Sequence, residues 1–405
     1  MDRIKIHNFG PVKDVDIELS KLMVFIGPQG SGKSTIAKLL TIFSDVYWWI
    51  TICNNKNPMS EFKKMGIAKY FVSDTYIEYH GRSGVNIVYS DGKYNMSIDG
   101  YSAEETIGFC AMLIGKSAND NLAKLGYKID GMELEIGDKE TEEQLYKKTL
   151  NNIKENYNYI RANMRFACYI PAERNMAGVV SSSLANIILS QIPLPNTLME
   201  YMSLFERAKN HYVTFDASFL GVRYDKDRGT DCISVFGETE KQLPLEECSS
   251  GVQSTLPMLM VADYVCEDKC FDTFVVEEPE QNLFPTNQRE VLNRLISIAN
   301  REECRYMIIN THSPYMLSAL NVSMLAAKVS KIENYKDEVD AIVSPEFRID
   351  TDNVAVYALG GTPCCKSIID NKTGLISVNY LDVISDTISS DFNRLYRIYL
   401  NTLHK

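Results

Sequence analysis

No uninterrupted apolar run in the sequence approaches the roughly eighteen residues of a membrane-spanning helix, so no membrane span is predicted. The chain opens Met1-Asp2-Arg3-Ile4 and passes directly into an alternating strand pattern, so no signal peptide is expected. The 10 cysteines include no C-x-x-C pair and no matching histidine cluster, which argues against a metal site built from these residues. Reduced thiols in a cytoplasmic protein are the simpler interpretation.

An excess of positive charge is also missing from the sequence. The formal net charge of −11 argues against a protein that coats DNA through its overall charge, although a local basic track is compatible with it. Two lysine runs are candidates for such a track, but both patterns are more typical of solvated faces: Lys56, Lys63, Lys64 and Lys69, and Lys147, Lys148 and Lys154. Nucleic-acid binding therefore stays open.

A glycine-rich stretch near the start of the chain is the most informative positive feature. It fits the pattern G-x-x-x-x-G-K-[ST], between a predicted buried strand at 22–26 and a predicted helix at 34–43. Glycines let consecutive backbone N–H groups point at phosphate oxygens, Lys33 can reach the terminal phosphates, and Ser34 supplies a hydroxyl for Mg²⁺. The sequence thus predicts a nucleotide-binding protein whose phosphate loop consists of Gly27, Pro28, Gln29, Gly30, Ser31, Gly32, Lys33, Ser34 and Thr35.

Two neighbouring carboxylates end an apolar strand far downstream. The strand Phe274–Glu278 leads into Pro279–Pro285, and its carboxyl end should lie beside the phosphate loop, where α/β sheets bind ligands. Because side chains alternate along a strand, Glu277 and Glu278 should point in different directions and take different roles. We expect Glu277 to hold the water shell of Mg²⁺ and Glu278 to polarise the attacking water.

Two further motifs complete a series. The predicted strand Tyr306–Asn310 ends in Thr311–Pro314, which contains His312. A histidine at a strand end would, by itself, favour a structural role, but this one follows two other nucleotide-site motifs. The motif Ser249–Gln253 lies about twenty residues before the acidic strand and opens a predicted apolar helix over 254–265. Its form is similar to the L-S-G-G-Q signature of ABC-type ATPases.

With all four motifs present, the chain resembles the ABC-type ATPase heads of the RecF and structural-maintenance-of-chromosomes (SMC) group. Within that group it is most similar to the ATPase part of the overcoming-lysogenization-defect (OLD) family and to related stand-alone ATPases of bacterial anti-phage systems. The resemblance covers about two-thirds of the chain and rests also on Ile4–Pro11, Tyr169–Arg174 and the Glu-Glu-Pro-Glu form of the acidic motif. The chain departs from the family pattern at Ser249 and Val252 in the signature and at Glu277, where aspartate is usual.

The resemblance implies an α/β fold of the P-loop NTPase class, namely an ABC-type ATPase head with an antiparallel strand subdomain and a helical insertion. It implies ATP and Mg²⁺ as cofactors, with Ser34 and Glu277 directed at the metal. It also implies Glu278 and His312 as catalytic residues, the histidine by contact with the γ-phosphate.

The resemblance further implies a head-to-tail homodimer that sandwiches two ATP molecules. In such a dimer Ser250, Gly251 and Gln253 cap the ATP of the other subunit, because a Ser-Gly turn at a helix N-terminus offers N–H donors to a γ-phosphate. Gln281 and Asn282 would fall in the loop that contacts the other subunit. Glu173 occupies the place of the Q-loop glutamine, with the alternative that Glu173 and Arg174 form a solvated pair.

The expected domain organisation has four parts. Residues 1–100 and 166–345 form the two halves of the ATPase head, 101–165 a helical insertion, and 346–405 a small cap or partner surface. Within them we predict antiparallel strands over 76–99 with a hairpin turn at Asp91-Gly92, and two strands around 225–229. A helix is predicted at 389–403, and Asp350 and Asp352 are interpreted as a turn.

Three function classes follow. The first is a defence ATPase whose ATP-dependent dimerisation regulates a separate effector, expected to be a nuclease, and the second is a RecF-like DNA-repair ATPase that shares every motif. The RecF-like beginning and the Glu-Glu-Pro-Glu motif argue against the third, a transporter ATPase. About ninety residues follow His312, too few for the Toprim nuclease domain of OLD nucleases, so this chain is not expected to cut nucleic acid. Assembly beyond the dimer stays open.

Overall fold

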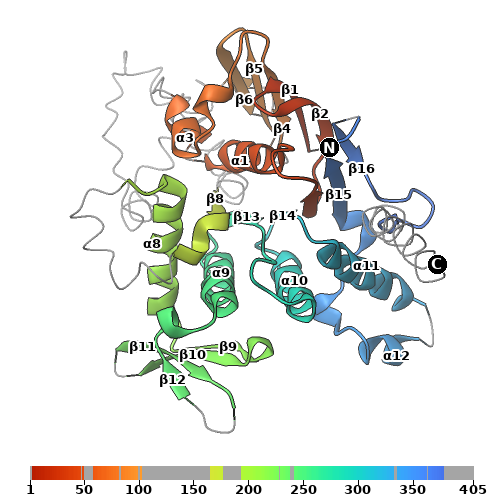
Figure 1. Cartoon of the computed structure of the whole chain (residues 1–405). Helices are drawn as coiled ribbons and strands as arrows, with labels where there is room; N and C mark the ends of the chain where they lie inside the picture. Colours follow the sequence, from red (N-terminus) through yellow and green to blue (C-terminus); the bar gives the residue numbers. More distant parts are fainter. Residues whose placement is uncertain are drawn as a thin grey trace, which may run out of the picture. The chain divides into compact units, whose positions relative to one another are not determined.

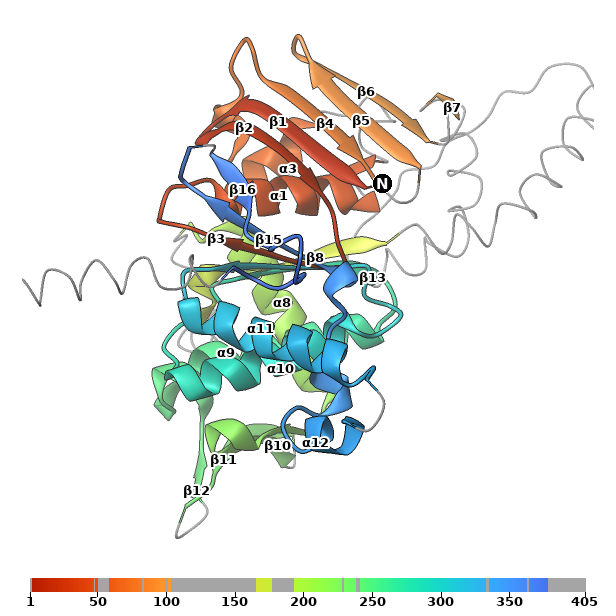
Figure 2. The ribbon, with the colours of Figure 1, turned by 90° about the vertical axis from the view of Figure 1, so that its right-hand side faces the viewer.

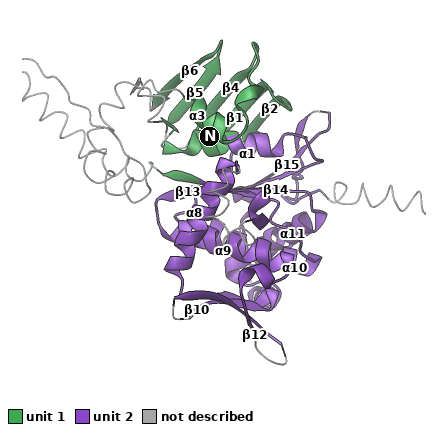
Figure 3. Ribbon diagram, turned by 60° about the vertical axis from the view of Figure 1, so that its left-hand side comes forward, with its two compact units in different colours: residues 1–18, 39–167 green, residues 19–38, 168–405 purple. Residues whose placement is uncertain are grey.

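The computed structural model describes residues 2–46, 48–49, 58–81, 84–98, 101–102, 165–176, 193–227, 229–237, 241–332, 335–362 and 364–377. The chain forms two compact units (Figure 3), the first from residues 1–18 and 39–167 and the second from residues 19–38 and 168–405. The predicted helical insertion, apart from its first two residues and its last, lies outside the described residues, and so does the predicted helix at 389–403.

The first unit contains a six-stranded sheet in the order β2-β1-β4-β5-β6-β7, with antiparallel pairing throughout. Its strands are β1 (Arg3–Phe9), β2 (Val12–Glu18), β4 (Tyr76–His80), β5 (Val85–Ser90), β6 (Lys93–Ile98) and β7 (Tyr101–Ser102). The predicted hairpin is confirmed, because Asp91 and Gly92 join β5 to β6 with φ of 50° and 75°, the left-handed pair that a type I′ turn requires.

Aromatic side chains fill the core of this unit between the sheet and the helices α3 (Met59–Lys64) and η1 (Ala68–Tyr70). The Phe43 and Trp48 rings lie 5.0 Å apart between centroids, and Trp48 meets Tyr94 edge-on at 5.5 Å. In the first lysine run, Lys64 pairs with Glu61 at 2.9 Å on the surface of α3, as a solvated face predicts, and Lys56 lies outside the described residues.

The second unit is built on a six-stranded sheet in the order β16-β15-β3-β14-β13-β8. The strands are β3 (Leu22–Ile26), β8 (Phe166–Ile170), β13 (Phe271–Glu277), β14 (Tyr306–Thr311), β15 (Val354–Leu359) and β16 (Cys365–Ser367). The neighbours β15, β3, β14 and β13 are parallel, and every residue of β3, β13 and β14 is buried, as expected for central strands covered on both faces. Their carboxyl ends therefore share one edge, where the phosphate loop and the acidic motif meet.

Helices α9 (Ser250–Glu267), α10 (Pro285–Ala299) and α11 (Pro314–Val329) lie side by side on one face of this sheet (Figures 1 and 2). Helix α8 (Asn196–His211) packs along α9, and α1 (Lys33–Ser44) follows β3 directly. Helices α10 and α11 each begin with a proline, whose fixed φ and missing N–H suit the first turn. The short α12 (Lys336–Asp340) follows α11. Among the described residues no helix is long and apolar enough to cross a membrane.

A second sheet of this unit lies beyond α9, on the side away from the six-stranded sheet (Figure 1). Its order is β12-β11-β10-β9, from β9 (Thr214–Ala217), β10 (Val222–Asp227), β11 (Thr230–Val235) and β12 (Lys241–Leu243). The prediction of two strands around 225–229 is confirmed by β10 and β11, and it missed β9, a four-residue strand with one buried residue. The predicted turn at Asp350 is also confirmed, since its carboxylate accepts from the Asp352 N–H at 3.3 Å.

Candidate functional site

The phosphate loop (Gly27–Thr35) connects β3 to α1 in a conformation that glycine makes accessible. Gly27, Gly30 and Gly32 have φ of 154°, 74° and 100°. A Cβ atom on Gly27 would lie 2.3 Å from the Leu359 carbonyl oxygen, so this position also needs glycine for the close approach of β15. A Cβ atom on Gly30 would meet nothing within 4 Å, so the loop is open on that side.

Two polar side chains of the loop, those of Lys33 and Ser31, carry buried hydrogen-bonding groups. Nζ of Lys33, a buried residue, donates to the carbonyl oxygens of Gly27 at 2.7 Å and Pro28 at 2.9 Å, which leaves one of its three N–H groups for another acceptor. Burial lowers the pKa of Lys33, and the nearby carboxylates oppose that change. The Ser31 hydroxyl is buried with no hydrogen-bond partner in the part of the chain that the structure describes.

Glu277 ends β13 directly opposite the start of α1. The Ser34 hydroxyl donates to its Oε2 at 2.9 Å, while Tyr169 and Asn310 donate to its Oε1 at 2.9 Å and 2.8 Å. Burial raises the pKa of Glu277, and the hydrogen bonds from Ser34, Tyr169 and Asn310 partly offset the effect. A dication between Ser34 and Glu277 would relieve this cost of a buried carboxylate, so the pair suits Mg²⁺.

Glu278 has a backbone conformation that glycine usually adopts. Its φ of 44° costs about 1 kcal/mol or more for a residue with a side chain, a strain that folded proteins keep mainly at functional sites. Its carboxylate accepts from Gln281 Nε2 at 2.9 Å and lies 3.4 Å from His312 Nε2. The two predicted catalytic residues, Glu278 and His312, therefore lie side by side at the carboxyl edge of the sheet. About one-third of each side chain is exposed.

Glu280 holds the segment that carries His312. Its Oε1 accepts from the Thr311 hydroxyl at 2.8 Å and from the His312 backbone N–H at 2.7 Å. Its Oε2 is buried with no partner among the described residues. The third carboxylate of the acidic motif (Glu277–Glu280) thus orients the end of β14 through its backbone.

The signature turn (Ser249–Gln253) begins α9 and presents both of its serines to solvent. A Cβ atom on Gly251 would lie 2.9 Å from the Asn282 carbonyl oxygen, so the turn rests against the loop that follows the acidic motif. Gln253 holds the turn from behind by donating to the carbonyl oxygens of Glu246 at 2.9 Å and Cys248 at 2.8 Å. Val252, which stands where the family has glycine, is buried. Its side chain therefore does not obstruct the exposed face of the signature turn.

The alternative of a solvated pair at Glu173 and Arg174 is wrong for the arginine. Glu173 is exposed, but Arg174 is buried completely, with its guanidinium bound to main-chain carbonyl oxygens. The sequence pattern misled because unpaired arginine is rarely fully buried, so a Glu-Arg dipeptide indicates a surface.

Five residues of the site went unassigned in the sequence. They are Tyr169, Arg174, Glu280, Asn310 and Gly360. Four of them lie within or beside motifs that the sequence did reveal. Gly360 follows β15, and a Cβ atom there would lie 3.0 Å from Pro28 Cγ, so the Gly360-Gly361 pair was the available signal for close packing on the phosphate loop.

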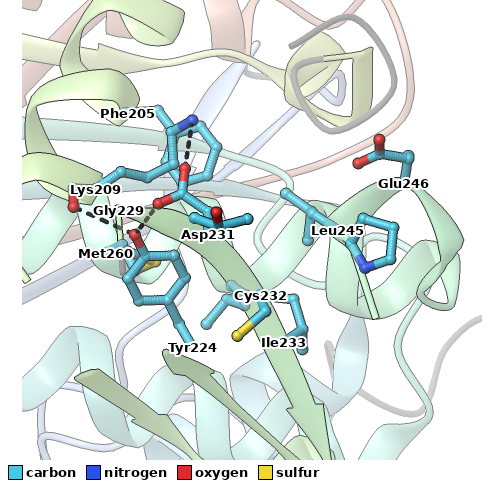
Figure 4. A pocket seen from close by; sticks show the side chains of 13 residues that line it. Phe205, Lys209, Tyr224, Gly229, Asp231, Cys232, Ile233, Leu245, Glu246 and Met260 are labelled. Carbon is cyan, nitrogen blue, oxygen red and sulfur yellow. Dashed lines mark hydrogen bonds and ion pairs between the residues drawn. The ribbon is translucent and has the colours of Figure 1, made fainter. Parts of the chain in front are cut away.

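A pocket of about 370 Å³ is lined by residues of α8, α9 and the four-stranded sheet (Figure 4). Apolar side chains of α8, η5 (Leu245–Glu247) and α9 line one side, and the other carries polar groups that satisfy one another. The Tyr224 hydroxyl donates to Asp231 Oδ1 at 2.6 Å, and Lys209 Nζ lies 3.2 Å from Asp231 Oδ2.

A family model described as the AAA ATPase domain matches residues 1–197 and 115–317, together more than half of the chain. The chain belongs to this family. With the parallel sheet and its phosphate loop, this confirms the predicted α/β P-loop NTPase fold.

Among known proteins, the OLD nuclease of Thermus scotoductus is 20% identical over 342 residues, which are 78% of this chain and 59% of that protein. This AAA ATPase-domain chain therefore spans about three-fifths of the length of that curated relative. The SMC head domain from Thermotoga maritima is 14% identical, covering 78% of this chain and 90% of that chain with a TM-score of 0.37. An Smc head domain with an extended coiled coil, bound to the C-terminal domain of ScpA and derived from Pyrococcus furiosus, is 13% identical, covering 96% and 98% with a TM-score of 0.39.

The residues present fit the ATP and Mg²⁺ that an AAA ATPase domain implies. The Ser31 hydroxyl, the remaining N–H of Lys33 and the backbone N–H groups in the first turn of α1 form a donor set for phosphate oxygens. Ser34 and Glu277 are two ligands of the kind Mg²⁺ takes from a protein when phosphates supply the rest. Among the described residues there is no group of three or more His, Cys, Asp or Glu side chains that could hold a metal ion by itself.

Proposed function

We propose that this protein binds and hydrolyses ATP with Mg²⁺ as an ABC-type ATPase, and that ATP-dependent dimerisation is its working step. The observation that carries the proposal is the direct hydrogen bond of 2.9 Å between Ser34 of the phosphate loop and Glu277 of the acidic motif. It brings together two motifs more than two hundred residues apart at the carboxyl edge of one parallel sheet, the usual ligand site of such sheets.

Each residue then has one task. Lys33 and the loop N–H groups neutralise and orient the phosphates, and Ser34 and Glu277 would hold Mg²⁺, which would supply electrostatic stabilisation of the transferred phosphoryl group. Glu278 accepts a hydrogen bond from the attacking water and polarises it. His312, held by Glu280, lies beside Glu278 and can donate to the γ-phosphate.

Dimerisation is supported by what surrounds this edge. Ser249 and Ser250 are exposed at the N-terminus of α9, where donors and the helix dipole favour a phosphate. Asn282 is exposed with φ of 59°, and the next aromatic residue, Phe284, is 73% exposed. These exposed side chains are available to contact a second copy of the chain, whose ATP would then bind the signature turn.

Mixing two inactive variants tests the composite site. An exchanged heterodimer of Lys33→Ala and Ser250→Arg has one site with both defects and one with neither. We expect up to about half of the wild-type ATPase rate to return, because each heterodimer keeps one of its two composite sites intact. Phosphate release by the mixture, compared with each variant alone, gives the measurement.

The matched control mixes Lys33→Ala with Glu278→Gln. These two changes act on the same side of a composite site, so both sites of the heterodimer are defective and no activity should return. Recovery in the control, or none in the first mixture although fluorescence shows subunit exchange, contradicts the composite arrangement.

We propose that dimerisation signals to a separate effector in anti-phage defence. The similarity to an OLD nuclease supports a link to nucleic-acid cleavage, and the alternative is a RecF-like role in DNA maintenance. The acidic motif is committed to the nucleotide site, and the described residues offer no metal cluster for a second reaction. The purified chain alone should therefore leave plasmid, linear and single-stranded DNA and RNA intact with ATP and Mg²⁺ or Mn²⁺.

A copurification experiment identifies the effector. Copurification of tagged protein followed by mass spectrometry should recover a nuclease, in amounts that differ between wild type and Glu278→Gln. A DNA-repair protein in its place favours the RecF-like alternative. Cleavage that persists in Glu278→Gln and follows the chain through a final sizing column contradicts the division of labour.

A further inference from the structure

Arg174 is a buried cation that contacts both the acidic motif and the signature helix α9. Its Nη1 donates to the carbonyl oxygens of Pro171 at 3.2 Å and of Glu277, and its Nη2 donates to the Glu278 carbonyl oxygen at 2.6 Å. Its Nε donates to the Ser254 carbonyl oxygen at 3.3 Å. All of these acceptors are main-chain carbonyls, and burial lowers the pKa of Arg174 without removing its charge.

The hydrogen bond from Arg174 to the Glu278 carbonyl helps to hold the strained backbone of Glu278. The left-handed conformation of Glu278 is held from both sides, since its N–H donates to the Asn310 carbonyl oxygen at 2.8 Å and its own carbonyl accepts from Arg174. A strained conformation persists only where its surroundings determine it. Arg174 therefore helps to set where the Glu278 carboxylate points.

Arg174 also contacts the helix that carries the signature turn. Ser254 lies one turn into α9, and the helix contains Pro257, which has no N–H for the Gln253 carbonyl. The signature turn is thus bound less completely to the rest of α9 than an ordinary first turn. The Ser254 and Thr255 hydroxyls are buried without a hydrogen-bond partner among the described residues. Their side chains therefore pack in this part of the helix but do not hold it by hydrogen bonds.

We propose that Arg174 is a positioning residue that couples the signature helix to Glu278. A planar guanidinium that binds the carbonyl of Ser254 together with those of Glu277 and Glu278 cannot follow a shift of α9 without changing the bonds at the two glutamates. When the signature turn engages the partner's ATP, the shift of α9 therefore reaches the water-polarising carboxylate within the same chain. This inference rests on the proposed function and adds a route by which one site senses the other.

Arg174→Lys tests the coupling because it keeps the charge and removes the fork. We expect kcat to fall about 100-fold, the loss typical of a misplaced acid–base group. The dissociation constant for ATP with Mg²⁺ and the midpoint of ATP-dependent association should change by less than about threefold, since only transition-state stabilisation is lost. Steady-state kinetics, equilibrium ATP binding and sedimentation are measured on the same full-length preparations.

Arg348→Lys is the matched control. Arg348 is also largely buried, and its Nε donates to the Val343 carbonyl oxygen at 3.0 Å, but it lies between α12 and β15 with no contact to the acidic motif. It should leave kcat within about twofold of wild type. An unchanged kcat in Arg174→Lys overturns the proposal, and so does a loss that appears equally in ATP affinity and in melting temperature, which a merely structural role predicts.

A second measurement does not require an Arg174 variant to fold. Residue-resolved hydrogen exchange of the Glu278 amide should be slower with ATP than with ADP in wild type, and Ser250→Arg should abolish the difference. Equal rates with ATP and with ADP in wild type, or a difference that persists in Ser250→Arg, overturn the coupling. A wild-type protein that neither hydrolyses ATP nor dimerises in its presence contradicts the proposed function itself. Loss of coupling alone leaves that function standing.

Discussion

Replacing Lys33 with alanine is expected to abolish ATP binding at concentrations that saturate the wild type. The ammonium group is the cation built into the phosphate loop, where it donates to two loop carbonyls and retains an N–H for a phosphate oxygen. Removing it leaves several phosphate charges without their main counter-charge from the protein, and we expect affinity to fall by about 100-fold or more. Fluorescent ATP titration measures the loss.

Lys21→Ala provides the comparison. Lys21 precedes the same strand at its opposite end and donates to the Arg301 carbonyl oxygen at 3.2 Å, so its removal alters charge and surface without touching the loop. Its ATP affinity should equal that of wild type. If Lys33→Ala binds ATP as tightly as Lys21→Ala does, the phosphate loop has been assigned wrongly.

Glu278→Gln is expected to separate binding from turnover. Glutamine preserves the shape of the side chain but cannot polarise water, so kcat should fall about 10²- to 10⁴-fold while ATP still binds. Glu277, which contacts Ser34 and lies on the other side of the strand end, keeps its metal-binding role in this variant. Single-turnover hydrolysis and ATP retention after rapid desalting give the two quantities.

Glu290→Gln serves as the control for this substitution. Glu290 lies on α10, where its carboxylate accepts from Asn293 Nδ2 at 3.4 Å, so loss of its charge should leave turnover unchanged. Hydrolysis by Glu278→Gln at the wild-type rate removes the role given to Glu278 and directs attention to Glu280 or His312.

Local patterns in the sequence predicted the parts of this site, and long-range packing supplied their alignment. The strand at 22–26, the hairpin at Asp91-Gly92 and the helix after Ser249 each follow from periodicity or turn chemistry within a few residues. The position of the acidic strand's carboxyl end beside the phosphate loop follows from the rule that parallel strands place their carboxyl ends together. Such predictions succeed because each depends on one local signal.

Arg174 and Glu280 show what the sequence could not provide. Three of the four carbonyls that bind Arg174 belong to Glu277, Glu278 and Ser254, eighty or more residues away, and nothing in a Tyr-Ile-Pro-Ala-Glu-Arg run encodes them. Glu280 binds the His312 amide, a backbone group that carries no residue-specific signal. Roles that side chains play toward distant main-chain atoms emerge only when the fold is known.

The most direct test of the account is the mass of Glu278→Gln in solution with different nucleotides. Because this variant should retain ATP without hydrolysing it, light scattering after size exclusion should give twice the subunit mass with ATP and Mg²⁺ and the single-subunit mass with ADP and Mg²⁺. Adding Ser250→Arg should return the ATP sample to the single-subunit mass. The same mass with ATP and with ADP, in a preparation shown to contain bound ATP, would contradict an ATP sandwich formed by the signature turn.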